Sequence, residues 1–574
     1  MSDSLCPIFA PARSGLLAAA EPLSASAAQP AVGYGALVAL VGVIGVSIWL
    51  GARAQQVVRR SSFLSGYFLG NRGLGAWALA LTATVQSGGT FMGYPSMVYT
   101  HGWIVGLWIA GYMVVPITAF AVFGKRLAQL SHRTGAITVP DMFRARFASP
   151  TLGLIASLLI LCFMSLLMVA QFKAGAILMK SVWPDSAPLA TAAGKAAGID
   201  VRYFVGLAIF SVTVIGYTLV GGFLASVWTD MFQSLLMAVG VVLLFVLVVP
   251  AASQAGFSAP TLNAVGVTGP GFASGPGFSA PGHWFLPPTL ALSYFVVWVF
   301  GGLGTPAGMI RVMASKDTRT LRRSIVLLSV YNLLIYLPLL VICICARAIL
   351  PELESSDEVM PRLALWATRD LPGGSLVSGL ILAAPFGAVM STISAYLVVI
   401  ASSLVRDVYQ HFLRPTASQA EVRRVAQGVM IVLGLAAVAA SIRPVDYLQT
   451  LIVFSAAACG ATFFVPAWML AYWPRATAAG AGAAMLAGAG TILGLLVAGL
   501  VLAGQGWVQP IDQPTAFPSY YPAGFHPLIF ALGASLAAGV VVSLVTKPPP
   551  RAVVAKLFLP PRATPGAPPS TPAA

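Results

Sequence analysis

Three oxygen-bearing groups lie within one helical turn of a strongly apolar segment. In an α-helix, residues three and four apart share a face, so the main-chain carbonyl of Ala388 lies beside the hydroxyls of Ser391 and Thr392. Neutral oxygens suit a monovalent hard cation better than Ca²⁺ or Mg²⁺, which favour acidic ligands. The spacing indicates a sodium site. Alternatively, the hydroxyls only bond back to the preceding turn or give a small face for close helix packing.

The composition defines the kind of protein that carries this segment. The chain has 574 residues, of which 58% are hydrophobic and only 8% are charged. Apolar runs recur from residue 35 to residue 545, and each needs about 20 residues to cross a bilayer. We therefore predict an all-α polytopic membrane protein with about thirteen transmembrane helices. The run at 35–51 is predicted to be the first span rather than a removed signal peptide.

The charges indicate how the chain is oriented. Its net charge is +16, but the basic residues flank apolar spans, so we expect a lipid bilayer and not nucleic acid as the partner. With the N-terminus outside, 23 of the 32 Lys and Arg residues fall in cytoplasmic segments. The positive-inside rule then places the C-terminus in the cytoplasm. We expect a multi-pass protein of the plasma (inner) membrane. Five scattered cysteines predict neither a disulfide framework nor a zinc site.

We expect one membrane domain with flexible attachments. The transporter domain is predicted over 33–546, with its core at about 74–473. Residues 1–32 are predicted to be a disordered tail, and 547–574 a cytoplasmic Pro/Ala-rich tail. The Gly/Pro/Ser/Ala-rich stretch 253–285 is predicted to be a flexible extracellular loop.

Two predicted spans contain residues that interrupt a helix. The span 74–99 carries Gly88 and Gly89 near its middle, and the span 289–312 carries Gly301-Gly-Leu-Gly-Thr-Pro-Ala-Gly308. If the first span of the chain is peripheral, these are the first and sixth of ten core helices. Matched interruptions in two halves indicate an inverted-repeat transporter with its site at the breaks. Glycine and proline could also serve only packing or a kink.

Main-chain N–H groups at such breaks can hold a carboxylate or hydroxyls through the helix-end dipoles. The predicted solute-binding residues are Ser87, Gly88, Gly89, Thr90, Gly304 and Thr305.

The chain resembles the sodium:solute symporter family between about residues 35 and 545. Family signatures are matched by Tyr217-Thr-Leu-Val-Gly-Gly-Phe-Leu-Ala-Ser-Val-Trp-Thr-Asp230 and by Tyr472-Trp-Pro-Arg-Ala-Thr-Ala-Ala-Gly-Ala481. The stretches most similar to the sodium/pantothenate branch are Leu81-Thr-Ala-Thr, Thr138-Val-Pro-Asp-Met-Phe-Arg-Ala-Arg-Phe147, Leu382-Ala-Ala-Pro and Gly524-Phe-His-Pro527.

The resemblance implies a 5+5 inverted-repeat core of ten helices, with one extra helix before it and two after. It implies sodium ligands at the carbonyls of Ala83 and Gln86 and at Ala388, Ser391 and Thr392. The Gln86 side chain is further expected to reach the solute. The resemblance also places Asp230 on the sodium release path, although an acid at a span margin can be a plain interfacial residue.

The predicted function is sodium-coupled import of a small organic solute, a carboxylate such as pantothenate, by alternating access. Proline, a monocarboxylate, a sugar or a nucleobase are alternative solutes, and a transporter-like membrane sensor is the alternative of another class. We predict neither enzymatic activity nor an organic cofactor, because no catalytic cluster or phosphate loop appears in the spans. Lys173 is expected to snorkel to the outer interface or, alternatively, to face the cavity and attract an anion. Oligomeric state is left open.

Overall fold

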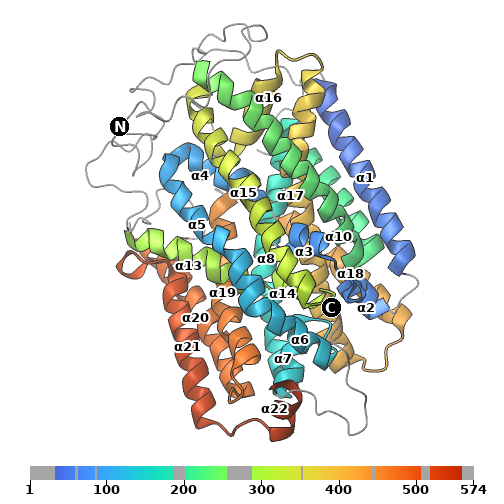
Figure 1. Cartoon of the computed structure of the whole chain (residues 1–574), viewed down its shortest axis with the longest axis vertical. Helices are drawn as coiled ribbons and strands as arrows, with labels where there is room; N and C mark the ends of the chain where they lie inside the picture. Colours follow the sequence, from blue (N-terminus) through green and yellow to red (C-terminus); the bar gives the residue numbers. More distant parts are fainter. Residues whose placement is uncertain are drawn as a thin grey trace.

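The computed structural model describes residues 33–58, 63–83, 87–184, 201–254, 288–350, 353, 355–442, 448–505 and 518–558. Over these residues the chain is helical, and its one β element there is an isolated bridge between Leu74 and Ser315. Long helices run side by side along the molecule, with short α16 at one end and α22 at the other (Figure 1). The predicted tail 1–32, Gln86 and most of the predicted loop 253–285 lie outside the described residues.

The main helices are listed here in chain order: α1 (Tyr34–Val58), α2 (Phe63–Leu69), α3 (Ala76–Ala83), η3 (Gly89–Gly93), α4 (Tyr94–His101), α5 (Gly106–Val115), η5 (Pro116–Gly124), α6 (Lys125–Thr134), α7 (Val139–Phe147), α8 (Pro150–Ser181), α10 (Val201–Gln254), α13 (Pro288–Gly304), α14 (Pro306–Met313), α15 (Thr318–Ile349), η6 (Ser356–Glu358), α16 (Val359–Thr368), α17 (Gly374–Ser402), η7 (Ser403–Leu413), α18 (Gln419–Ser441), α19 (Leu448–Tyr472), α20 (Ala478–Ala503), α21 (Pro527–Val545) and α22 (Arg551–Phe558).

Ten of the described helices are long and apolar enough to cross a membrane, and a bent pair adds an eleventh. Helix α10 spans 54 residues, about 80 Å at 1.5 Å per residue, which is far longer than one crossing. It is interrupted at Gly222, whose φ of 59° is readily adopted only by glycine. Counting α10 twice, and α3 with α4 once, would give thirteen. The number thirteen itself stays a prediction.

Both predicted interruptions are present. Helix α3 ends at Ala83, Ser87 is non-helical, and helical structure resumes at Gly88. Helices α13 and α14 meet at an angle of 46° around Thr305, which has an extended backbone. Pro306 follows as the first residue of α14, because proline has no N–H with which to continue the helix before it.

Helix α17 lies at the centre of the molecule. In its most apolar 18-residue window 94% is buried, against 28% for α1. Small residues let its neighbours approach, as is usual between membrane helices. A Cβ added to Gly240 of α10 would lie 2.7 Å from the Cβ of Ala384, and one added to Gly387 would lie 3.0 Å from Gln233. The oxygens of α17 therefore face protein and not lipid.

The ends of the two interrupted helices are tied together. The N–H of Leu74 donates to the carbonyl of Ala314 at 3.2 Å, and the N–H of Lys316 donates to Leu74 at 3.2 Å. These bonds join the segment before α3 to the segment after α14.

Within the predicted tail 547–574 the structure contains helix α22. Its Leu557 is buried, and the Phe558 ring lies 4.8 Å from the guanidinium of Arg126 and 5.0 Å from that of Arg146. This helix therefore packs on α6 and α7.

Candidate sodium and solute sites

The oxygen cluster of α17 has the predicted geometry. The hydroxyls of Ser391 and Thr392 each donate to the carbonyl of Ala388 at 2.9 Å, and all three residues are buried. Among the described residues no group of three His, Cys, Asp or Glu side chains could hold a metal. The cluster is thus suited to an ion that accepts neutral oxygens. The same bonds also fit the alternative in which the hydroxyls only bond back to the preceding turn. Sodium binding at the cluster therefore stays a prediction.

The break in the first interrupted helix lies against α17, one residue along the chain from this cluster. A Cβ added to Gly88 would lie 3.3 Å from the side chain of Val389, the residue next to Ala388. Ala83 is the last described residue of α3, and residues 84–86 lie outside the described part of the chain. The roles of Ala83 and Gln86 as ligands stay predictions.

A chain of polar groups leads from the cluster to Asp230. The Ser394 hydroxyl donates to the carbonyl of Ser391 at 3.0 Å and lies 3.1 Å from the hydroxyl of Ser226. Ser226 in turn donates to Asp230 at 3.3 Å. Asp230 is only 2% exposed, so the structure contradicts the alternative that it is a plain interfacial residue.

Arg311 was missed as a partner of Asp230. Its Nη2 lies 2.5 Å from Asp230 Oδ2, and both side chains are buried. Arg311 belongs to α14, within the predicted span 289–312. Opposite charges in two apolar spans are the signal that could have suggested this pair, because ionisable groups inside a membrane usually pair.

The predicted anion-holding N–H groups are engaged within the protein. The N–H of Gly88 donates to Gln171 Oε1 at 2.7 Å, that of Gly89 to the Ser87 hydroxyl at 3.0 Å, and that of Thr90 to the Ser87 carbonyl at 2.9 Å. A solute would have to replace these bonds. Gln171 of α8 was not predicted as part of this break.

The second break, between α13 and α14, contributes to helix packing as well as to the candidate solute site. A Cβ added to Gly304 would lie 2.7 Å from the Cα of Gly460, so Gly304 allows α13 to approach α19. The Thr305 hydroxyl donates to the carbonyl of Gly301 at 2.6 Å.

A cavity of about 110 Å³ lies between the two breaks, and both Ser87 and Thr305 line it. The rest of its wall is largely apolar, with aliphatic, Met and aromatic side chains and three glycines. Of the predicted solute-binding residues, Gly88, Gly89, Thr90 and Gly304 are not part of the wall. Lining residues that the sequence analysis missed include Tyr112, Trp298, Tyr396 and Ser455.

Lys173 forms a buried ion pair. Its Nζ lies 3.7 Å from Asp357 Oδ2, and the two residues are 7% and 4% exposed. Lys173 therefore does not snorkel to the interface, which corrects that expectation. Burial raises the pKa of the Asp357 carboxyl above its ordinary value, and the Lys173 ammonium opposes the rise.

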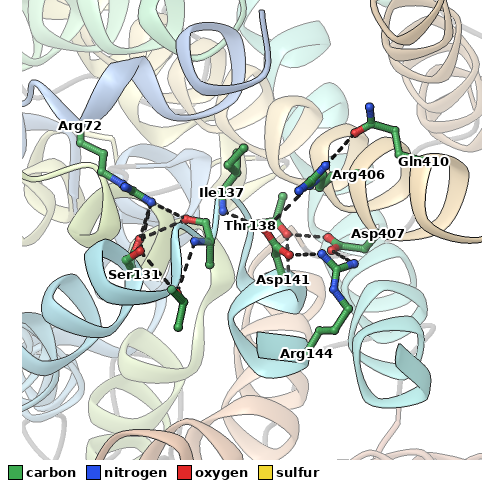
Figure 2. Close-up of polar contacts among 11 residues, drawn as sticks. Arg72, Ser131, Ile137, Thr138, Asp141, Arg144, Arg406, Asp407 and Gln410 are labelled. Atoms are coloured by element: carbon green, nitrogen blue, oxygen red, sulfur yellow. Dashed lines mark hydrogen bonds and ion pairs between the residues drawn. The ribbon is translucent and has the colours of Figure 1, made fainter. Parts of the chain in front are cut away.

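A separate network braces the C-terminal end of the α17–η7 segment (Figure 2). The Thr138 hydroxyl donates to Asp407 at 2.5 Å, and it also caps α7 by accepting the N–H of Asp141 at 3.0 Å. Arg144 pairs with both Asp141 and Asp407. The motif that starts at Thr138 thus joins α7 to η7, which is a structural role.

Two interrupted helices around a central cavity define a membrane transporter. The profile of the Sodium:solute symporter family matches residues 67–488, and the chain belongs to this family. It is 31% identical over 521 residues to the sodium/pantothenate symporter of Escherichia coli (strain K12), covering 90% of this chain and 96% of that relative. It is 27% identical over 455 residues to the sodium/proline symporter of the same organism, covering 76% and 83%.

A solved structure of a Na⁺-coupled sialic acid symporter is also similar. Its TM-score is 0.69 at 20% identity, over 90% of this chain and 99% of that one, which shows a shared fold. The fold class is therefore confirmed. The relatives are symporters by name, which confirms a transporter rather than an enzyme.

Proposed function

We propose that this protein imports a small organic carboxylate together with Na⁺, with pantothenate as the first solute to test. The observation that carries the proposal is the cavity lined by Ser87 and Thr305, from the two interrupted helices, and by Tyr396 of α17, the helix that carries the oxygen cluster. Solute and ion would then share the first broken helix as a wall. The similarity to a sodium/pantothenate symporter supports the choice of solute.

In this proposal sodium ties the first broken helix to α17. Carbonyls of Ala83 and Gln86 would complete the ligand set of Ala388, Ser391 and Thr392. Because Gly88 packs on Val389, ordering of the break by the ion would also order the cavity wall at Ser87.

Release of the ion would follow the hydroxyls of Ser394 and Ser226 to Asp230. Asp230 Oδ1 is buried and has no hydrogen-bond partner within the described part of the chain, so it can receive a cation. Each net charge that enters gains about 2.3 kcal/mol per 100 mV, or roughly fortyfold accumulation.

We place the protein in the inner membrane with its N-terminus outside and its C-terminus in the cytoplasm. The excess of Lys and Arg in the cytoplasmic segments supports this orientation.

The test is uptake of radiolabelled pantothenate into proteoliposomes with an imposed inward sodium gradient. We expect accumulation that needs sodium and rises with an inside-negative potential. Uptake that is indifferent to sodium contradicts the coupling, and sodium-driven uptake of a sugar but of no carboxylate contradicts the solute class.

Proline is the second solute to test, because sodium/proline symporters are also among the relatives. Competition between proline and pantothenate in the same assay decides between them.

A further inference from the structure

The buried pair of Lys173 and Asp357 lies beside the break in the first interrupted helix. Asp357 belongs to η6, which packs against η3 and α4 of that helix. The same break lies against the cavity wall, because a Cβ added to Gly89 would lie 3.1 Å from Ile452, which lines the cavity. Lys173 itself follows two residues after Gln171, which holds the N–H of Gly88 at the break.

Asp357 reaches this position from outside the spans. It belongs to η6, a three-residue helix between the spans α15 and α17, and so it is carried by a short connecting element. Its Oδ1 has no hydrogen-bond partner among the residues that the structure describes. The Asp357 carboxylate therefore lies against the buried Lys173 ammonium through Oδ2, while its Oδ1 lacks a hydrogen-bond partner among the described residues.

The pair links three elements that surround the site. Lys173 belongs to α8, Asp357 to η6, and Ser96, which donates to Ser356 beside Asp357 at 2.6 Å, to the outer half of the first broken helix. Displacement of Asp357 would free the outer half of the broken helix from η6 as well as expose the ammonium.

We propose that Lys173 is the residue that recognises the carboxylate of the solute, and that Asp357 occupies Lys173 until the solute carboxylate takes its place. This inference rests on the proposed transport of a carboxylate. It adds a specificity residue and an internal competitor to that function.

Exchange of one carboxylate for another avoids an uncompensated buried charge. A buried ammonium that loses its partner is strongly destabilising, whereas a solute carboxylate replaces the lost partner in kind. A neutral solute offers no such replacement. The neighbouring charges on η6 and α16, Glu358 and Arg362, are bonded to each other at 3.0 Å and are partly exposed, so they compete weakly.

The test compares pantothenate with pantothenol, in which a CH₂OH group replaces the carboxylate. In Lys173→Gln we expect the KM for pantothenate to rise roughly 10- to 100-fold, because a charged hydrogen bond is lost. The Ki of pantothenol as a competitor should change less than about threefold, because the alcohol does not need the ammonium. Lys173→Arg keeps the charge and should remain nearer to the wild type than to Lys173→Gln.

Asp357→Asn gives an independent readout. Removal of the internal competitor should lower the KM for pantothenate by about threefold or more, an effect that a merely structural ion pair would not produce. If Lys173→Gln does not insert into the membrane, this variant decides, and an unchanged or raised KM overturns the inference.

The role of Lys173 and the proposed transport of a carboxylate are overturned by different results. Wild-type uptake of pantothenate, with a KM in Lys173→Gln equal to that of the wild type, overturns the inference alone. Wild-type uptake of a sugar but of no carboxylate overturns the proposed solute and this inference together.

Discussion

The oxygen cluster of α17 and the cavity between the breaks are built in opposite ways. The cluster takes its three groups from five consecutive residues of one helix, where α-helical geometry fixes their distances. The cavity takes its wall from at least α5, α8, α13, α14, α17 and α19. The α17 part of the proposed sodium site therefore follows from local sequence, and the wall of the proposed solute site follows from tertiary packing.

This difference makes the two halves separable by mutation. Changes in the cluster should alter sodium dependence and leave solute preference, whereas changes in the cavity wall should do the reverse. At two tertiary contacts this separation should fail: substitutions at the Asp230–Arg311 pair or at the close approach of Gly304 to Gly460 should affect both sodium dependence and solute binding.

The largest effect is expected at the buried Asp230–Arg311 pair. Asp230→Asn leaves Arg311 as an uncompensated buried charge, which costs about 3–5 kcal/mol of stability. Thermal melting of the purified protein should show this loss, and the double variant Asp230→Asn with Arg311→Gln should recover part of it. If Asp230→Asn melts at the wild-type temperature, Asp230 and Arg311 do not form a buried ion pair. The proposed ion path then does not depend on this pair.

A smaller loss of stability is expected at Gly304. Gly304→Ala places a Cβ 2.7 Å from the Cα of Gly460, and because backbone cannot yield easily, overpacking should cost about 1–3 kcal/mol. Gly428→Ala is the matched control, since no described atom lies within 4 Å of its added Cβ. Equal melting temperatures for the two variants would contradict the close approach of α13 and α19.

Ser455 tests the cavity half of this comparison. Its hydroxyl lines the cavity and is buried without a hydrogen-bond partner over the described ranges, so it is available to the solute. Ser455→Ala should raise the KM for pantothenate about tenfold, through the loss of a hydrogen bond to a charged group. The sodium concentration for half-maximal uptake should stay the same, and a shift in sodium dependence alone would count against two separate halves.

The sequence predicted what depends on neighbours along the chain. The breaks followed from Gly88, Gly89 and Pro306, and the cluster followed from the spacing of Ser391 and Thr392. Contacts between distant residues could not be predicted in this way, because Asp230 and Arg311 are 81 positions apart and only the fold brings them together.

Lys173 shows the same limit. A lysine in an apolar span suggested snorkelling, since the sequence does not show which residue will face it. Its partner Asp357 comes from a short helix outside the spans and meets it only after α8 and η6 have packed. Likewise, Ser87 and Thr305 were predicted, whereas the other lining residues, among them Tyr112, Trp298 and Tyr396, were not.

The most direct test of the central claim is the sodium dependence of uptake in Thr392→Ala, with Ser391→Ala beside it, in proteoliposomes. If these hydroxyls are sodium ligands, the half-saturating sodium concentration should rise about threefold in each variant, with water replacing part of the lost ligand. The KM for pantothenate at saturating sodium should remain that of the wild type. Wild-type sodium dependence in both variants would contradict the account and leave the hydroxyls with a packing role.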